Sequence, residues 1–446
     1  MRPVRGSERI LTEMWKARSV PGAGSMTSDG RGVEVLYPGR RNTDRGPDFV
    51  GAVIRLGGAT ESRGDVELHM RASDWRSHGH HLDPEYNRVI LHVACRGRAP
   101  VSLENGGLAP TLELGWLPNG DTGGAVGEAP ACPARREPCR GAAGVLGENA
   151  IGKLLDEAGD ERFRLKADDL LVRLAFEGAE QLLYSDVLGA LGYSKNRKPF
   201  LELAGRLPYA DLMGACGDEG PAGSVVKLEA LLFGMAGLLT VAGDERHVRL
   251  WRACGGGEPM PRSAWRLFRV RPANHPVNRI KGVARLLSRA REEGGLLDYA
   301  MRAVASAVAG QHGLERDFMV TAAPSPEANR SPLIGRGRAR DLIVNVVLPF
   351  VHAWGSANCR AALCERALYL YRSHPPGAEN NVTRELDALL GSRAGRTAAS
   401  ARRQQGLIHI AKTYCHRGDC RGCPVAAQLA DRIADSRAQV YTSVLV

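Results

Sequence analysis

The spacing of apolar residues changes once along this 446-residue chain. Before residue 118 the apolar residues form short runs bounded by Gly and Pro, which predicts strands at residues 32–37, 49–56, 65–70 and 88–95. After residue 148 they recur at intervals of three and four residues, which predicts helices. We therefore expect an α+β/α multidomain protein, in which a small α/β domain precedes a large irregular α-helical domain.

Residues 1–118 are predicted to form a small α/β domain. Apolar residues at helical spacing over residues 8–18, after Ser7 as a capping residue, predict a first helix. Three strands follow, then a helical turn at residues 83–87 and a fourth strand. That last strand is apolar enough to lie in the centre of a sheet.

The remainder of the chain divides by composition. Residues 119–148 are rich in Gly and Pro and are predicted to be a linker or an irregular excursion. Residues 149–400 show no fixed repeat and predict an irregular α-helical domain, and residues 401–446 form a C-terminal cysteine-containing segment. The helical patterns cover residues 153–191, 201–215, 225–241, 280–290, 339–353 and 361–372.

The net charge indicates a class of partner. The chain has 60 Lys and Arg against 49 Asp and Glu, a formal charge of +11, which favours binding to nucleic acid. The alternative is that an Arg-rich, Ala-rich and Gly-rich composition reflects a GC-rich genome. The first ten residues lack the apolar stretch of a secretory signal, and residues 228–241 are too short to span a bilayer. We therefore expect a cytoplasmic protein with no membrane partner, and no feature sets its oligomeric state.

Carboxylates at two predicted strands indicate a metal site. Asp48 stands at the entrance of the second strand, and Glu67 and His69 lie two apart on the third, so both point to one side of the sheet. Mg²⁺ and Mn²⁺ prefer such hard oxygen ligands. Asp48 and Glu67 are the predicted ligands, and His69, two residues after Glu67, would help to position a metal-bound water molecule.

A group of histidines follows the same strand. His69, His78, His80, His81 and His92 lie close together in the sequence, next to a loop that carries Asp74 and Trp75. We interpret that loop as part of an active site, with His80 as a catalytic candidate and Asp83 as a secondary one. The alternative is that these are exposed loop residues and that His92 is an ordinary core histidine.

The dipeptide Pro47-Asp48 and the triplet Glu67-Leu68-His69 resemble the motif of the PD-(D/E)xK nuclease superfamily. The resemblance implies a restriction-endonuclease-like core that cleaves phosphodiester bonds with a metal-activated water. The superfamily usually has Lys where this chain has His69. Because His can bind a metal or donate a proton, the change favours Mn²⁺ or a transition metal over Mg²⁺.

Segments along the whole chain resemble an uncharacterised bacterial family catalogued as domain of unknown function number 2851. That resemblance implies that the two parts of the chain belong together and brings no function with it. The segments are GPDF (46–49), GDVELH (64–69), SDW (73–75), ILHV (90–93), LGYSKN (191–196), EALLFG (229–234), RPANHP (271–276), NVVLPF (345–350) and QQGLI (404–408).

Three cysteines near the C-terminus predict a structural metal centre. Cys415, Cys420 and Cys423 form a C-x4-C-x2-C pattern, which suits Zn²⁺ or an Fe-S cluster. Either metal needs a fourth ligand, for which the candidates are Cys359, Cys364, His409 and His416. The alternative is a set of thiols that bind no metal.

Three functions remain open from the sequence. The first is a metal-dependent or degenerate nuclease acting on DNA or RNA. The second is a non-catalytic nucleic-acid-binding protein with a structural metal centre. The third is a Zn²⁺-dependent hydrolase that uses the histidine group.

Overall fold

The computed structural model describes residues 11–12, 14–16, 26–42, 46–58, 61–114, 138–217, 219–268, 270–308, 313–321, 332–391, 398–415 and 419–444. Most of the predicted linker, including Cys132, lies outside these residues. His416 also lies outside them. Of the predicted first helix, residues 11–12 and 14–16 are described, and they are helical. Two compact units are present, one of residues 1–151, 389–391 and 408–446, the other of residues 152–388 and 392–407.

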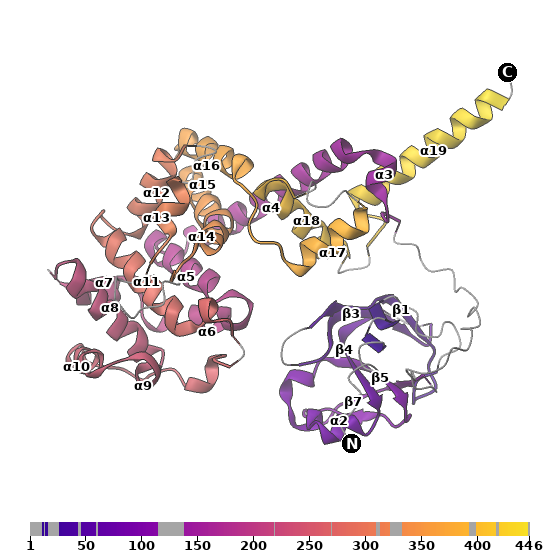
Figure 1. The fold of residues 1–446 in the computed structure, drawn as a ribbon, viewed down its shortest axis with the longest axis horizontal. Helices are drawn as coiled ribbons and strands as arrows, with labels where there is room; N and C mark the ends of the chain where they lie inside the picture. Colours follow the sequence, from indigo (N-terminus) through magenta and orange to yellow (C-terminus); the bar gives the residue numbers. More distant parts are fainter. Residues whose placement is uncertain are drawn as a thin grey trace. The chain divides into compact units, whose positions relative to one another are not determined.

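The N-terminal domain is built on one mixed sheet (Figure 1). Its strands follow the order β1-β3-β4-β5-β8, with β2 paired to β3. The pairs β1-β3 and β3-β4 are antiparallel, whereas β4-β5 and β5-β8 are parallel. The strands are β1 (Val33–Tyr37), β2 (Arg40–Arg41), β3 (Phe49–Leu56), β4 (Glu61–Arg71), β5 (Val89–Arg96) and β8 (Thr111–Glu113). A separate two-stranded sheet pairs β6 (Val101–Ser102) with β7 (Leu108–Ala109).

Alternation along β4 separates an apolar face from a polar one. Val66 and Leu68 are buried in the main core of this domain, together with Leu11 and Trp15 of the first helix. Glu67 and His69 therefore point to the opposite face, although they too are buried. The sequence pattern thus places the predicted site residues on the face that the first helix does not cover.

The connection between β4 and β5 crosses back over the polar face. Parallel strands require such a crossover, and here it contains α2 (Asp74–Ser77), η1 (His80–Leu82) and η2 (Pro84–Tyr86). Asp83 caps η2 by accepting a hydrogen bond from the backbone N–H of Glu85 at 3.1 Å. The predicted helical turn at residues 83–87 is therefore a short 3₁₀ helix.

The strand β4 begins earlier than the sequence indicated. The strand was predicted to begin at residue 65, but Gly64 lies inside it. A side chain at Gly64 would come within 2.4 Å of a methyl group of Ile90 and 2.6 Å of the carbonyl oxygen of Arg88. The glycine therefore permits close packing of β4 against the start of β5.

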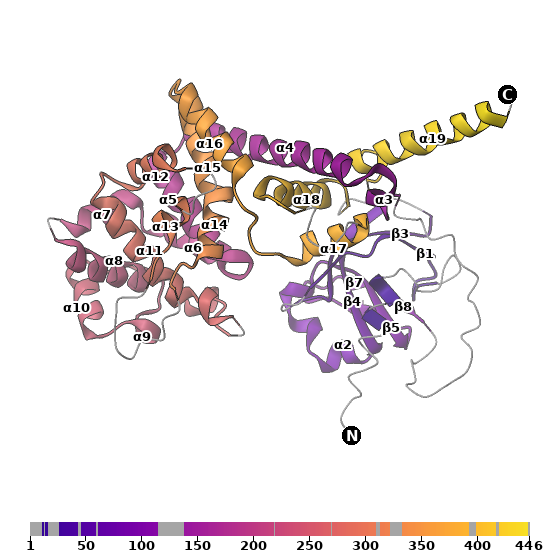
Figure 2. The same ribbon diagram turned by 45° about the horizontal axis from the view of Figure 1, so that its top comes forward.

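The second unit is a large helical region (Figure 2). One cluster of buried apolar residues, which includes Leu182, Phe233, Leu287 and Phe350, holds its helices together. Helix α4 begins in the last residues of the first unit, and α17 and α18 end in residues that belong to the first unit. The helices are α4 (Glu148–Leu174), α5 (Ala179–Leu191), α6 (Tyr193–Arg206), α7 (Tyr209–Cys216), α8 (Pro221–Met235), α9 (Leu239–Ala242), α10 (Glu245–Ala253), α11 (Pro276–Arg291), α12 (Leu296–Ser306), α13 (Gly313–Phe318), α14 (Arg336–Leu342), α15 (Leu348–Ala357), α16 (Ala361–Ser373), α17 (Asn381–Leu390) and α18 (Ala401–Thr413).

Several predicted helices are interrupted. The pattern over residues 225–241 divides into α8 and α9 because Gly237 has a positive φ of 67°. A side chain there would lie 2.1 Å from the carbonyl oxygen of Met260. The pattern over residues 339–353 contains a π-helical turn, Ile343–Val347, between α14 and α15.

The expected fold class is confirmed, since a mixed-sheet domain precedes a large helical region. In the first unit the helices α3 (Ala142–Leu146) and α19 (Pro424–Val444) also contact each other. Among the described residues, no helix has both the length and the apolar character needed to cross a membrane.

Candidate metal centre

Three histidines meet on the polar face of the sheet. His69 lies on β4, His78 follows α2 and His80 begins η1. Each offers one ligand atom, and these three atoms lie within 4.8 Å of one another. We call His69, His78 and His80 the histidine trio. It could hold a metal ion, because imidazole nitrogens at such separations can bind one cation.

A chain of hydrogen bonds fixes the protonation of His69. The hydroxyl of Thr111 donates to the carbonyl oxygen of Ala99 at 2.7 Å, so it accepts from His92 Nδ1, 3.0 Å away. His92 Nε2 then has a lone pair and accepts from His69 Nδ1 at 3.0 Å. His69 Nε2 is therefore left with a lone pair, the form in which an imidazole binds a metal.

Burial keeps these imidazoles neutral. Desolvation, followed by the neighbouring His92, His80 and His78, lowers the pKa of His69 to about 2. Desolvation, with a smaller contribution from His80, lowers the pKa of His92 to about 4. A neutral imidazole keeps the lone pair that a metal requires, so the burial favours metal binding over protonation.

The third member of the trio has a buried nitrogen without a hydrogen bond. Within the described part of the chain, His80 Nε2 is buried and makes none. The ring stacks on His69 and on Tyr86, with ring centroids 5.2 and 4.0 Å away. Burial of an unsatisfied polar atom is costly, so a ligand on this nitrogen would offset that cost.

Two carboxylates lie beside the trio. Glu67 Oε1 is 3.5 Å from His69 Nε2 and 3.3 Å from His80 Nε2. Its other oxygen accepts from the backbone N–H of Asp48 at 2.8 Å, and Asp48 Oδ2 accepts from the N–H of Leu68 at 3.1 Å. The negative charges of Asp83 and Asp48 both favour the charged form of His80, although desolvation lowers its pKa overall.

The structure thus brings Asp48, Glu67, His69 and His80 into one region. His78, which the sequence singled out only as part of the histidine group, completes the trio. Asp83 caps η2 and acts on His80 through its charge. Whether Asp48 and Glu67 bind a metal stays a prediction. The sequence feature that could have identified His78 as a ligand is its position two residues before His80 in the crossover.

The predicted metal centre at the C-terminal cysteines is wrong. Among the described residues the histidine trio is the group that could hold a metal, and Cys415, Cys420 and Cys423 are not clustered. Cys423 is 4% exposed just before the start of α19, where it packs as an apolar residue, while Cys420 is exposed. The turn between them is closed by Asp419, which accepts from the N–H of Gly422 at 2.9 Å.

Among the described residues, none of the predicted fourth ligands belongs to a metal-ligand group, and His416 lies outside these residues. Cys364 Sγ lies 3.3 Å from the carbonyl oxygen of His352, within the helical unit. Cys359 is exposed and has a positive φ of 54°. Both cysteines belong to the compact unit that does not contain the three C-terminal cysteines. His409 is buried on α18 and is not part of any metal-ligand group among the described residues.

Comparison with known families matches residues 8–381 to a family described as a protein of unknown function, DUF2851. The match covers most of the chain, which belongs to this family. No curated protein and no solved structure matches the chain. None of the comparisons supports the resemblance to PD-(D/E)xK nucleases.

Proposed function

We propose that this protein is a metal-dependent hydrolase of phosphodiester bonds in nucleic acid, with its metal ion held by the histidine trio. The observation that carries the proposal is the approach of three imidazole nitrogens within 4.8 Å of one another, beside Glu67 Oε1. The order of the strands around the site and the motif at Asp48 and Glu67 are also compatible with a nuclease core.

The donor atoms select the kind of metal. Imidazole nitrogens suit Zn²⁺, Mn²⁺ or Fe²⁺ better than Mg²⁺, which prefers oxygen ligands alone. Three protein ligands leave one coordination position open for water or substrate, as catalytic zinc sites do. The trio therefore shifts the expected metal from Mg²⁺ towards a transition metal.

The protein residues have separable roles. A bound metal would lower the pKa of a coordinated water molecule to a value near neutrality. Glu67 is held by the Asp48 N–H so that its Oε1 faces the trio, and we assign it as the base that accepts a proton from that water. His92 and Thr111 hold His69 in its ligand form.

Two substitutions test the proposal. His78→Ala should remove the bound metal, measured by elemental analysis, and abolish cleavage of DNA or RNA with Zn²⁺ or Mn²⁺. Glu67→Gln should retain metal and lower the cleavage rate by about 10²- to 10⁴-fold, the usual effect of losing a general base. His81→Ala, next to the trio, is the control and should change neither quantity. Wild-type metal content and cleavage in His78→Ala would refute the proposal.

A second function is a non-catalytic nucleic-acid-binding protein with a structural metal. It is favoured by the origin of the ligands, because two histidines of the trio come from the crossover and one from β4. A metal there would tie the crossover to the sheet. In that case metal removal lowers the melting temperature, and the wild-type protein cleaves no nucleic acid with any divalent metal.

A further inference from the structure

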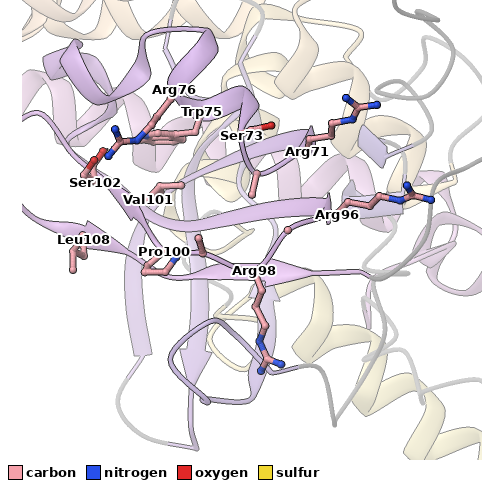
Figure 3. A pocket seen from close by; sticks show the side chains of 13 residues that line it. Arg71, Ser73, Trp75, Arg76, Arg96, Arg98, Pro100, Val101, Ser102 and Leu108 are labelled. Carbon is pink, nitrogen blue, oxygen red and sulfur yellow. The ribbon is translucent and has the colours of Figure 1, made fainter.

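A hollow lined by arginines lies at the end of the strands that carry the metal centre (Figure 3). It has a volume of about 600 Å³. Its lining contains Arg71, Arg76, Arg96 and Arg98 and, among the described residues, no Asp or Glu. We call this the arginine hollow. Four cationic side chains around one depression form a surface for an anion.

The arginine hollow lies at the end of β4, the strand that also carries His69 of the histidine trio. Arg71 and Arg96 are register partners at the carboxyl ends of the parallel strands β4 and β5. The ends are held together by a hydrogen bond of 2.8 Å from the Ala72 N–H to the carbonyl oxygen of Arg96. Arg71 follows His69 by two residues on the same face, which is about 7 Å along a strand.

Trp75 forms the wall between the two sites. Its side chain lines the arginine hollow, while its ring centroid lies 5.4 Å from that of His80 and 5.5 Å from that of His92. The indole N–H donates to the carbonyl oxygen of Ser102, another lining residue, at 3.0 Å. A ligand in the hollow would therefore lie against the side chain that supports the metal centre.

The arginines of the hollow are not neutralised by carboxylates. Within the described residues, Arg71, Arg76 and Arg96 have no ion pair. Arg98 donates to the carbonyl oxygen of Thr27 at 3.0 Å, which is a neutral partner. The neighbouring Asp74 and Glu113 instead accept from backbone N–H groups of Arg71 and Gly97, at 3.1 and 2.7 Å. Positive charge therefore exceeds negative charge around the hollow.

The arrangement of these side chains favours an extended polyanion. In Figure 3 the side chains of Arg71 and Arg96 extend to one side, Arg76 lies across the hollow beside Trp75, and Arg98 points in a third direction. A single phosphate could not contact all four. Trp75 is 1% exposed, so no base can stack on it. Contacts to a nucleic-acid strand would therefore involve its phosphates and would not depend on base sequence.

We propose that the arginine hollow binds consecutive phosphates of a nucleic-acid strand and leads that strand to the histidine trio. The identity of the substrate rests on the proposed function, whereas the binding of the strand does not require catalysis.

The test measures binding without turnover. A fluorescent single-stranded oligonucleotide is titrated with the full chain in EDTA, and anisotropy is recorded at several salt concentrations. The double variant Arg71→Ala/Arg96→Ala should bind at least about tenfold more weakly. The slope of log K against log salt should fall by about 0.7 for each phosphate that the variant no longer neutralises. Arg76→Ala, on the short helix α2, provides an independent single variant.

Arg88→Ala is the matched control. Arg88 precedes β5, whereas Arg96 ends it, so the control removes one arginine, as Arg76→Ala does, but at the opposite end of the strand. It should bind as the wild type does. Equal binding by the wild type and by both the double variant and Arg76→Ala overturns the inference, as does the absence of strand binding at low salt. Strand binding that depends on these arginines, without cleavage under any metal, leaves the inference standing and refutes the proposed hydrolase.

Discussion

In the helical unit, the buried Glu229 and Glu315 lie against the guanidinium groups of Arg285 and Arg340. In the sheet domain, the buried His69 and His92 lie against other imidazoles. The first arrangement is complete because each charge has an opposite partner. In the second, hydrogen bonds join neutral imidazoles, and His69 Nε2 lies within 4.8 Å of the ligand atoms of His78 and His80. The difference separates polar groups that stabilise a fold from polar groups arranged for a ligand.

Removal of one partner of a buried ion pair tests most directly whether the ion pairs of the helical unit stabilise the fold. Glu229→Ala leaves Arg285 without its carboxylate, whereas His247 keeps Asp244, so the substitution should lower the free energy of unfolding by about 2–3 kcal/mol. Urea denaturation measures this change, and metal content should not change. Glu379→Ala removes an exposed carboxylate and is the control. A loss of metal from Glu229→Ala would contradict the separation of the two units' roles.

A smaller effect is expected from the hydrogen-bond chain behind His69. Thr111→Val removes the hydroxyl that orients His92, so the metal affinity should fall by about 10- to 100-fold. Competition with a chromophoric chelator measures that affinity. Thr383→Val is matched, because Thr383 is a buried threonine of the helical unit whose hydroxyl bonds to Asn380. If both variants bind metal as tightly as the wild type, these hydrogen bonds play no part in metal binding.

The smallest effect is expected at an exposed ion pair. Arg384 and Glu379 are paired at 2.8 Å with more than half of each side chain exposed. Arg384→Ala should therefore lower the free energy of unfolding by less than about 1 kcal/mol. Thermal denaturation of Arg384→Ala and Glu229→Ala, measured side by side, shows whether burial determines how much an ion pair contributes to stability. Similar losses in both variants would show that it does not.

The strands of the fold followed closely from the sequence. Residues 49–56 were predicted as a strand and form β3 with those bounds, and residues 88–95 correspond to β5 (Val89–Arg96). These segments are local patterns of apolar residues between turn residues. The start of β4 was not predictable, since it depends on how Ile90 packs over Gly64. Helix interruptions such as that at Gly237 depend in the same way on a distant carbonyl group.

The site was predictable in part. Alternation on β4 indicated that Glu67 and His69 share a face, and the histidine-containing loop after β4 indicated His80 as a neighbour. The contribution of His78 depends on the path of the crossover, which no periodicity encodes. The C-terminal cysteines show the reverse error, because close spacing in the sequence did not bring their side chains together. The arginine hollow was missed since its members come from β4, the crossover, the end of β5 and the segment after it.

The crossover between β4 and β5 also has a consequence for the order of assembly. All three imidazoles of the trio belong to the segment from His69 to His80, so the loop that must close to form the site is short. Short loops close at little entropic cost. On the ribosome, the strands through β8 emerge before any residue of the helical unit. The three imidazoles can therefore come together while the rest of the chain is still being synthesised.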